Sequence, residues 1–306
     1  MVPEPPHRLG ALALRIDSVG GLETSVDLPE WRLCLDIGRC PPHLLARDTV
    51  LFTHAHMDHL GGVAYHCATR SLLRMPRPTY VVPRSAMEPL ARLFAAWREL
   101  DQSELPHGLL PLGPGDTHAL RPDLWVRPFA TQHTVPSQGY AFFSRRKRLK
   151  PQFQGLPESK LRELARGGER ELSEPYETLE LAVTGDTLPD LIAAEAWVRQ
   201  AKVLLIECTF LDARVSVEKA RSTGHTHLFD LLPYLERLEN EVIGLYHFSA
   251  RYGPGEIERL LDRHLPPVQR ARIRALLPPR AGAGLTELPV LPDLATGEGP
   301  GEQQRL

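Results

Sequence analysis

The segment His54-Ala55-His56-Met57-Asp58-His59 limits what this chain can fold into more than any other stretch of its sequence. It directly follows the short β-prone run Val50 to Thr53 and places three imidazoles and a carboxylate in one loop. On a loop that leaves a strand, histidines two positions apart can converge on one metal ion while the next two residues turn towards a second. The loop therefore predicts two metal sites. The alternative is a set of surface histidines in a polar turn.

Two zinc sites need more ligands than one loop can supply. His133, Asp186 and His247 each stand at or just past the end of a later β-prone run. Strand ends are where α/β architectures place their chemistry, so all three are candidate ligands. Taken singly, Asp186 could instead cap the turn that follows it, and either histidine could be an ordinary residue at the edge of the core.

Short β-prone runs alternate with segments of helical periodicity along most of the chain, which predicts an α/β sandwich. Three antiparallel strands are expected between Leu12 and Ile37, where glycine turns separate apolar stretches. Further strands are expected at 79–82, 124–131, 139–144, 179–184, 203–207 and 242–247, and helices at 62–74, 84–100, 159–165, 227–238 and 255–265. One domain over residues 1–280 is expected. Residues 281–306 are rich in Pro, Gly, Ala and Glu and predict a disordered tail.

The composition limits the possible functions. The formal net charge is −2, so the chain as a whole does not attract phosphate groups. Any phosphate binding must come from a local basic patch. The cysteines form no C-x-x-C pair, which argues against a disulfide scaffold or a zinc ribbon and fits a reducing cytoplasm. The N-terminus shows no signal-peptide pattern and no apolar run is long enough to span a bilayer, so a soluble protein with no membrane contact is expected.

The order of the candidate ligands closely resembles the metallo-β-lactamase superfamily, in which an H-x-H-x-D-H loop is followed by a distant His, a bridging Asp and a final His. The resemblance runs from Leu12 to Leu277 and implies a four-layer αβ/βα sandwich with two Zn²⁺ per chain. It assigns His54, His56 and His133 to the first zinc, Asp58, His59 and His247 to the second, and Asp186 to the bridge. Zinc ions about 3.5–4 Å apart activate a bridging water and clamp the attacking and leaving oxygens of an in-line displacement.

Further motifs resemble ribonuclease Z within that superfamily. They are Ile206-Glu207-Cys208-Thr209-Phe210, similar to H-E-A-T but with Ile206 in place of His; Gly224-His225-Thr226-His227, similar to G-H-S-T; and His247-Phe248-Ser249-Ala250-Arg251-Tyr252, similar to H-x-S-x-R-Y. Asp36 to Pro41 and Ser137 to Tyr140 resemble the short, plant-type enzymes. The resemblance implies a zinc-dependent endoribonuclease that removes the 3′ trailer of precursor tRNA, leaves a 3′-hydroxyl, and forms a homodimer.

The resemblance makes Asp58, Glu207 and His225 the catalytic candidates, and elementary chemistry supports two of them. The 3′-oxygen of RNA is a poor leaving group as an alkoxide, so a group must protonate it as it departs. His225 is the candidate acid. Glu207 ends a hydrophobic strand, where an unpaired carboxylate is costly, and it could orient the imidazole and raise its pKa. The alternatives are an N-cap role for the turn at His225 and a strand-end salt bridge for Glu207.

Two groups of residues are candidates for contact with substrate phosphates. Ser249 and Arg251 follow the last ligand, although Arg251 could equally pair with a carboxylate. The second group is a basic run, which comprises Arg145, Arg146, Lys147 and Arg148. It lies between His133 and Asp186, where the ribonuclease Z enzymes that this chain resembles carry an arm that binds tRNA. The segment 145–175 is therefore expected to be such an arm, shorter and closer to the plant type. The alternative is that the run is a solvated surface.

Two other functions remain open from the sequence. A hydrolase of the same fold that acts on a small phosphodiester or thioester would keep the zinc ligands without needing the basic run. A nucleic-acid-binding protein that has lost catalysis would not need the complete ligand set or both Glu207 and His225.

Overall fold

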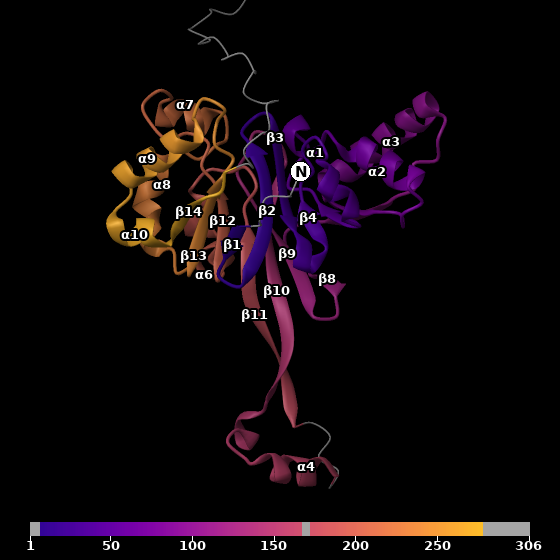
Figure 1. Cartoon of the computed structure of the whole chain (residues 1–306), viewed down its shortest axis with the longest axis vertical. Coiled ribbons are helices and arrows are strands. Elements are labelled where there is room, and N and C mark those ends of the chain that lie inside the picture. Colours follow the sequence, from indigo (N-terminus) through magenta and orange to yellow (C-terminus); the bar gives the residue numbers. More distant parts are fainter. Residues whose placement is uncertain (1–6, 167–171, 278–306) are drawn as a thin grey trace, which may run out of the picture.

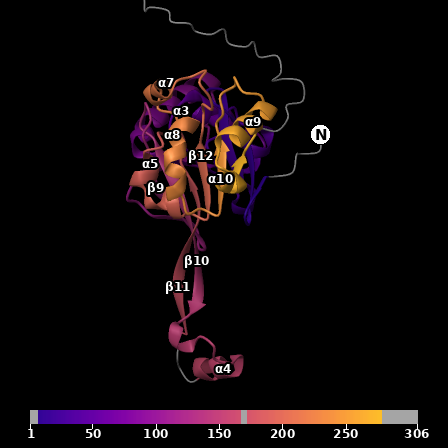
Figure 2. The ribbon, with the colours of Figure 1, turned by 90° about the vertical axis from the view of Figure 1, so that its left-hand side faces the viewer.

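Two seven-stranded β-sheets lie at the centre of the structure, a computed structural model that describes residues 7–166 and 172–277. Helices cover the outer face of each sheet, so the layers follow one another as helix, sheet, sheet and helix (Figure 1 and Figure 2). This arrangement confirms the expected four-layer αβ/βα sandwich. The predicted tail, 281–306, lies outside the described residues.

The first sheet keeps its strands in sequence order. They are β1 (His7–Leu9), β2 (Leu12–Val19), β3 (Glu23–Leu28), β4 (Leu33–Leu35), β5 (Thr49–Leu51), β6 (Thr79–Pro83) and β7 (Gly108–Leu112). Pairing is antiparallel from β1 to β4 and parallel from β4 to β7, so the carboxyl ends of β5, β6 and β7 open at one edge. The connections carry η1 (Pro29–Trp31), η2 (Pro42–Ala46), α1 (Met57–Leu60), α2 (Val63–Leu72), η3 (Arg84–Ala86) and α3 (Met87–Asp101).

The second sheet is ordered β14-β13-β12-β11-β10-β9-β8. Its strands are β8 (His118–Arg121), β9 (Leu124–Ala130), β10 (Gln138–Leu149), β11 (Ser173–Val183), β12 (Val203–Glu207), β13 (Val242–Tyr246) and β14 (Ile273–Ala275). β8 to β11 pair antiparallel and β11 to β14 pair parallel. The covering elements are α5 (Leu191–Ala194), α6 (Ala196–Gln200), α7 (Val217–Ser222), α8 (Leu228–Leu231), η5 (Leu232–Arg237), α9 (Pro254–His264) and α10 (Pro267–Arg272).

Central strands are buried on both faces because each lies between a sheet and a helical layer. In β5, Val50 packs under α2 and α3, whereas Leu51 packs between the two sheets. In β12, Leu204 packs under the helices of the second sheet and Leu205 packs between the sheets. A strand covered on both faces reads as a continuous apolar run, which is why these strands were visible in the sequence.

β10 and β11 continue beyond the sheet as a two-stranded arm. β9 pairs with β10 only as far as Ser144, whereas β10 and β11 stay paired to Leu149 and Ser173. η4 (Pro151–Phe153) and α4 (Glu158–Arg166) lie at the far end of the arm, well clear of the body in both views (Figure 1 and Figure 2). The basic run therefore stands on a projecting ribbon, and β10 is longer than the expected strand 139–144.

Two expected elements differ from the structure for local reasons. The helix expected over 227–238 is a short α8 followed by the 3-10 segment η5, because Pro233 has no N–H to continue α-helical bonding. The strand expected from Trp31 to Ile37 pairs only over Leu33–Leu35, since η1 occupies the residues before it. Among the described residues, every helix is too short or too polar to cross a lipid bilayer.

Candidate metal centre

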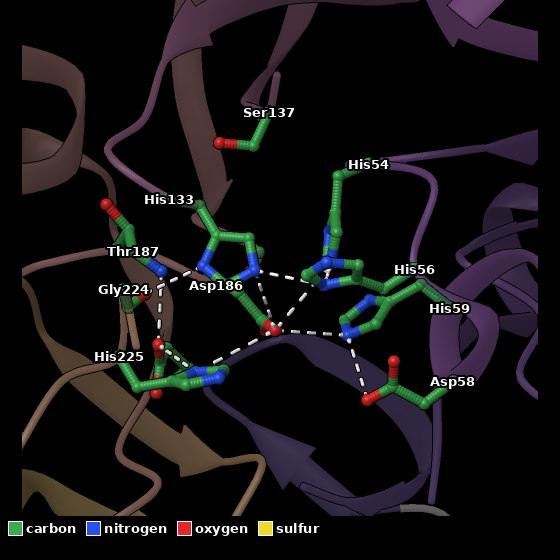
Figure 3. A network of polar contacts seen from close by, with 12 residues as sticks. His54, His56, Asp58, His59, His133, Ser137, Asp186, Thr187, Gly224 and His225 are labelled. Atoms are coloured by element: carbon green, nitrogen blue, oxygen red, sulfur yellow. Dashed lines mark hydrogen bonds and ion pairs between the residues drawn. The ribbon is translucent and has the colours of Figure 1, made fainter. Parts of the chain in front are cut away.

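Strand ends from both sheets bring the seven predicted ligands to one edge of the sandwich. Figure 3 labels all of them except His247. His54 and His56 follow β5, Asp58 and His59 lie on α1, and His133, Asp186 and His247 follow β9, β11 and β13. Five groups of side chains have ligand atoms within 4.8 Å of one another. Three consist of predicted ligands alone: His54, His56 and His133; His54, His59 and Asp186; and Asp58, His59 and His247. The other two include His225.

Asp186 occupies the middle of this cluster. Its Oδ2 lies 3.3 Å from Nε2 of His59 and 3.6 Å from Nε2 of His247. The same oxygen is 3.7 Å from Nε2 of His54 and 3.9 Å from Nε2 of His133. One carboxylate thus faces donors from both groups of histidines. This is the position that a bridging ligand requires.

Hydrogen bonds to Nδ1 fix the orientation of four of the five rings. Nδ1 of His54 lies 3.0 Å from Oγ1 of Thr53, and Nδ1 of His59 lies 2.8 Å from Oδ2 of Asp36. Nδ1 of His133 lies 2.8 Å from the carbonyl oxygen of Gly224, and Nδ1 of His247 lies 3.0 Å from Oγ1 of Thr209. Each bond turns the Nε2 of its ring towards the cluster. His56 is reversed, with its Nδ1 3.1 Å from Nε2 of both His54 and His133.

Asp36 contacts the cluster and was not among the candidate site residues. It is buried after β4, and its carboxylate accepts the N–H and hydroxyl of Thr53, each at 2.8 Å, as well as bonding to His59. The carboxylate thereby links the start of the histidine loop to α1. The segment Asp36 to Pro41 resembles the plant-type enzymes, but nothing in the sequence pairs Asp36 with a residue 23 positions away.

Two glycines allow the close approach of the ligand loops. Gly185 has φ 64°, and a Cβ there would stand 2.7 Å from the Cβ of Thr53. Gly224 has φ 73°, and a Cβ there would stand 2.7 Å from Nδ1 of His133. Any larger residue would strain the backbone and displace a neighbour of the cluster.

The donor set fits zinc. Nε2 of His59, Nε2 of His247 and Oδ1 of Asp186 are buried without a hydrogen-bond partner, which is costly unless another group satisfies them. Burial lowers the pKa of His54 to about 2, so its imidazole stays neutral as a metal ligand must. Imidazole and carboxylate donors that converge on two adjacent points are typical of paired zinc sites.

Buried Glu207 and half-buried His225 form a pair beside the cluster. Glu207 ends β12, and its Oε1 lies 3.1 Å from Nδ1 of His225 and accepts the N–H groups of Thr187 and Thr226 at 3.1 and 3.2 Å. Burial alone would lower the pKa of His225, but the charge and hydrogen bond of Glu207 raise it to about 9. The N-cap alternative for His225 is wrong, because His227 is the residue that caps α8.

Thr209 joins this pair to the metal ligands. Its hydroxyl donates to Oε2 of Glu207 at 2.7 Å and also lies 3.0 Å from Nδ1 of His247. Thr209 belongs to the segment that resembles H-E-A-T, but that motif does not indicate its contact with His247.

The candidate phosphate-binding residues lie in two places. Ser249 and Arg251 follow His247 directly, and within the described residues no carboxylate pairs with the exposed guanidinium of Arg251. The basic run lies far from the cluster. β10 begins at Gln138, whose N–H donates to the Thr53 carbonyl beside His54 at 2.9 Å. At about 3.3 Å per residue, the run starts roughly 23 Å further along the strand.

The four cations of the run are not equivalent. Arg145 pairs with Glu177 at 3.3 Å and Arg148 pairs with Glu174 at 2.9 Å, both across the ribbon. Arg146 and Lys147 make no ion pair with any described residue. The two unpaired cations are therefore the ones most available to an external phosphate.

Comparison with curated proteins gives similarities over about half to most of this chain, although no protein-family model matches the sequence. The tRNase Z TRZ1 of Arabidopsis thaliana is 42% identical over 261 residues, which are 85% of this chain and 92% of that protein. The chloroplastic tRNase Z TRZ2 of the same plant is 39% identical over 81% of this chain and 71% of its own length. The nuclear ribonuclease Z of Triticum aestivum is 47% identical over 49% of this chain and 86% of its own length.

Solved structures share the fold at much lower identity. The metallo-β-lactamase fold protein YhfI from Bacillus subtilis superposes with a TM-score of 0.57 at 12% identity, over 86% of this chain and 94% of that one. The short form of human tRNase Z superposes with a TM-score of 0.54 at 18% identity, over 78% of this chain and 93% of that one. These likenesses confirm the metallo-β-lactamase fold.

Proposed function

This chain belongs to the tRNase Z, or ribonuclease Z, family, and we propose that the cluster around Asp186 is the centre at which it processes the 3′ end of precursor tRNA. The activity is that of a tRNA 3′-processing endoribonuclease, which cuts a phosphodiester bond and leaves a 3′-hydroxyl on the tRNA. The observation that carries the proposal is the likeness to TRZ1, 42% identical over 92% of that protein.

Two zinc ions fit the cluster. His54, His56 and His133 would hold the first, Asp58, His59 and His247 the second, and Asp186 would contact both. When bound, such a pair supplies Lewis acidity to the phosphodiester and lowers the pKa of the attacking water. The opposite orientation of His56, which presents Nδ1 rather than Nε2, lets it reach the same point as its neighbours.

Asp58, Glu207 and His225 handle protons around the reacting phosphate. Burial opposes ionisation of Asp58, but the hydrogen bond with His247 and the nearby His59 hold its pKa below the ordinary range. Asp58 therefore stays ionised and can accept a hydrogen bond from the attacking water. Glu207 keeps Nδ1 of His225 occupied, so the ring presents Nε2 to the substrate and can protonate the leaving 3′-oxygen.

The test is a labelled precursor tRNA incubated with the zinc-loaded protein, with both new ends mapped. Cleavage at the 3′ side of the discriminator base, with a 3′-hydroxyl on the tRNA and a 5′-phosphate on the trailer, is the expected result. Turnover of small phosphodiesters with no specific cleavage of any precursor tRNA would contradict the assignment and favour a small-molecule hydrolase.

A homodimer is also proposed, and the helices that cover the first sheet support it. Seven large apolar side chains are exposed on or beside α1, α2 and α3: Met57, Tyr65, Leu72, Leu73, Leu93, Trp97 and Leu100. Exposed apolar surface of this kind is typical of interfaces. Sedimentation equilibrium should give twice the chain mass of 34.3 kDa, and Tyr65→Glu together with Leu72→Glu should give the monomer.

A reducing compartment such as the cytoplasm fits the cysteines. All four are buried free thiols. Proteins that mature in oxidising compartments generally pair their cysteines. Fluorescence microscopy of the tagged protein in its own cells would test the compartment.

A further inference from the structure

Two hollows lie on either side of the loop between β9 and β10. The first has a volume of about 560 Å³ and is lined by the carboxyl ends of β6 and β7 together with that loop. The second has a volume of about 370 Å³ and is lined by Leu188, Arg221 and Gly224 together with the same loop. The hollows share His133 and Thr134, so a candidate zinc ligand stands between them.

The direction of the substrate follows from the bond that is cut. Cleavage that leaves a 3′-hydroxyl on the tRNA places the leaving 3′-oxygen at His225, which directly follows Gly224 of the second hollow. The tRNA side of the bond therefore belongs to the second hollow. In Figure 3, His133 lies between His225 and Ser137, and Ser137 lines the first hollow. The RNA that carries the 5′-phosphate consequently leaves on the Ser137 side.

We propose that the first hollow is a binding site for the 5′-terminal nucleotides of the trailer, with Arg84 as its phosphate contact. The inference rests on the proposed tRNA-processing function and adds a second substrate subsite to it. Its volume lies within the range of about 300–1,000 Å³ that is typical of small-ligand pockets.

Arg84 is held in place for this role. One of its terminal nitrogens, Nη2, donates to Oδ1 of Asp116 at 2.7 Å, and Asp116 also accepts the N–H of Gly113 at 2.8 Å. The side chain is nevertheless 63% exposed. Nη2 makes both contacts with Asp116, so the N–H groups on Nε and Nη1 are left for a phosphate oxygen in the hollow. The paired carboxylate weakens the attraction of Arg84 for that phosphate, as it does for Arg145 and Arg148 in the arm.

The rest of the lining suits a nucleotide without favouring one base. Thr131 and Ser137 place hydroxyls there, 2.6 Å from each other. Pro83, Pro114 and Pro136 add apolar ring faces against which a base can lie. The wall of the hollow therefore combines polar and apolar surface, which suits the phosphate, the sugar and the base of a nucleotide together.

The experiment compares Arg84→Gln with Arg92→Gln, a matched control. Arg92 is 65% exposed and pairs with Glu88 on α3, outside both hollows. KM and kcat are measured for one precursor tRNA with a trailer of several nucleotides, and Kd is measured for mature tRNA without a trailer. Loss of one phosphate contact should raise KM about 10-fold, which corresponds to about 1.4 kcal/mol.

The expected pattern is a higher KM for the precursor with Arg84→Gln, an unchanged Kd for mature tRNA, and wild-type values with Arg92→Gln. Ser85→Trp, which would fill the hollow, should reproduce the pattern. If Arg84→Gln behaves as the control does, or weakens mature tRNA equally, the trailer site is refuted while the enzyme assignment stands. If the wild-type protein cuts no precursor, both fail together.

Discussion

His225 presents one ring nitrogen to the substrate in the proposed mechanism, because Glu207 holds the other at 3.1 Å. His225→Ala should leave the zinc content unchanged and slow cleavage of precursor tRNA by ~10²–10⁴-fold, the usual range for loss of a general acid. Single-turnover kinetics would measure the loss.

A phosphodiester with a nitrophenolate leaving group provides the control for His225. Nitrophenolate needs little protonation, so its release should suffer much less from the same substitution. Equal losses on both substrates would mean that His225 shapes the site rather than donating a proton.

Asp186 can be tested by metal content. Its Oδ2 faces four candidate ligand histidines at 3.3 to 3.9 Å, so Asp186→Ala should lose at least one zinc ion and nearly all turnover while the fold remains. Asp262→Ala, which removes a carboxylate paired with Arg270 on the surface of α9, is the matched control. Elemental analysis and circular dichroism would measure both variants, and retained turnover would remove Asp186 from the centre.

The sequence singled out the candidate ligands, which the structure brings together, because their residue types are distinctive and they follow strands closely. Asp36 and Thr209 belong to motifs that resemble the family, but the sequence did not predict what they contact. Their roles lie in hydrogen bonds to Nδ1 of His59 and His247, between residues 23 and 38 positions apart. Only the folded chain brings such pairs together, and neither residue type marks a site by itself.

At the scale of the element, the arm offers a sharper test than its whole basic run. Arg146→Ala with Lys147→Ala should weaken tRNA binding and reduce the slope of log affinity against log salt by roughly 0.7–0.9 for each lost phosphate contact. Arg145 and Arg148 already face Glu177 and Glu174, so their replacement should have a smaller effect.

Filter binding across a salt series would measure both arm variants, and a nitrophenyl phosphodiester would serve as the control. A substrate that small cannot span roughly 23 Å of strand, so its turnover should not change. An unchanged salt slope with the Arg146 and Lys147 variant would identify the run as a solvated face.

The bounds of a strand could be predicted from the sequence where both of its faces are buried, and less well where they are not. β12 matched its expected bounds because both of its faces are apolar. The arm strands did not, because outside the sheet their burial alternation weakens and pairing with one another holds them instead. Short edge strands such as β1 and β14 have only three residues each, too few to show an alternation of apolar and polar side chains.

For the whole molecule, the cluster joins the two halves of the sandwich. His54, His56, Asp58 and His59 belong to the first sheet and its connections, whereas His133, Asp186 and His247 belong to the second. Removing zinc should therefore lower the thermal midpoint, since a ligand present at 100 times its Kd stabilises the native state by about 2.7 kcal/mol.

Calorimetry before and after chelation would measure this stabilisation, with zinc readdition as the control. Elemental analysis of the zinc-loaded protein should give about two ions per chain. At most one ion after loading, or an unchanged midpoint on chelation, would contradict the paired site.

β10 begins at Gln138 beside the cluster and carries Arg146 and Lys147 near its other end, without a break in its pairing to β11 beyond the irregularity at Phe142 and Phe143. If the arm holds one part of the tRNA while the cluster cuts another, this strand acts as a ruler. The cut site would then be set by a length measured along the RNA rather than by the bases at the junction. Removing two residue pairs from the ribbon would shorten that ruler by about 6.6 Å, and the same enzyme would be expected to cut the same RNA at a different place.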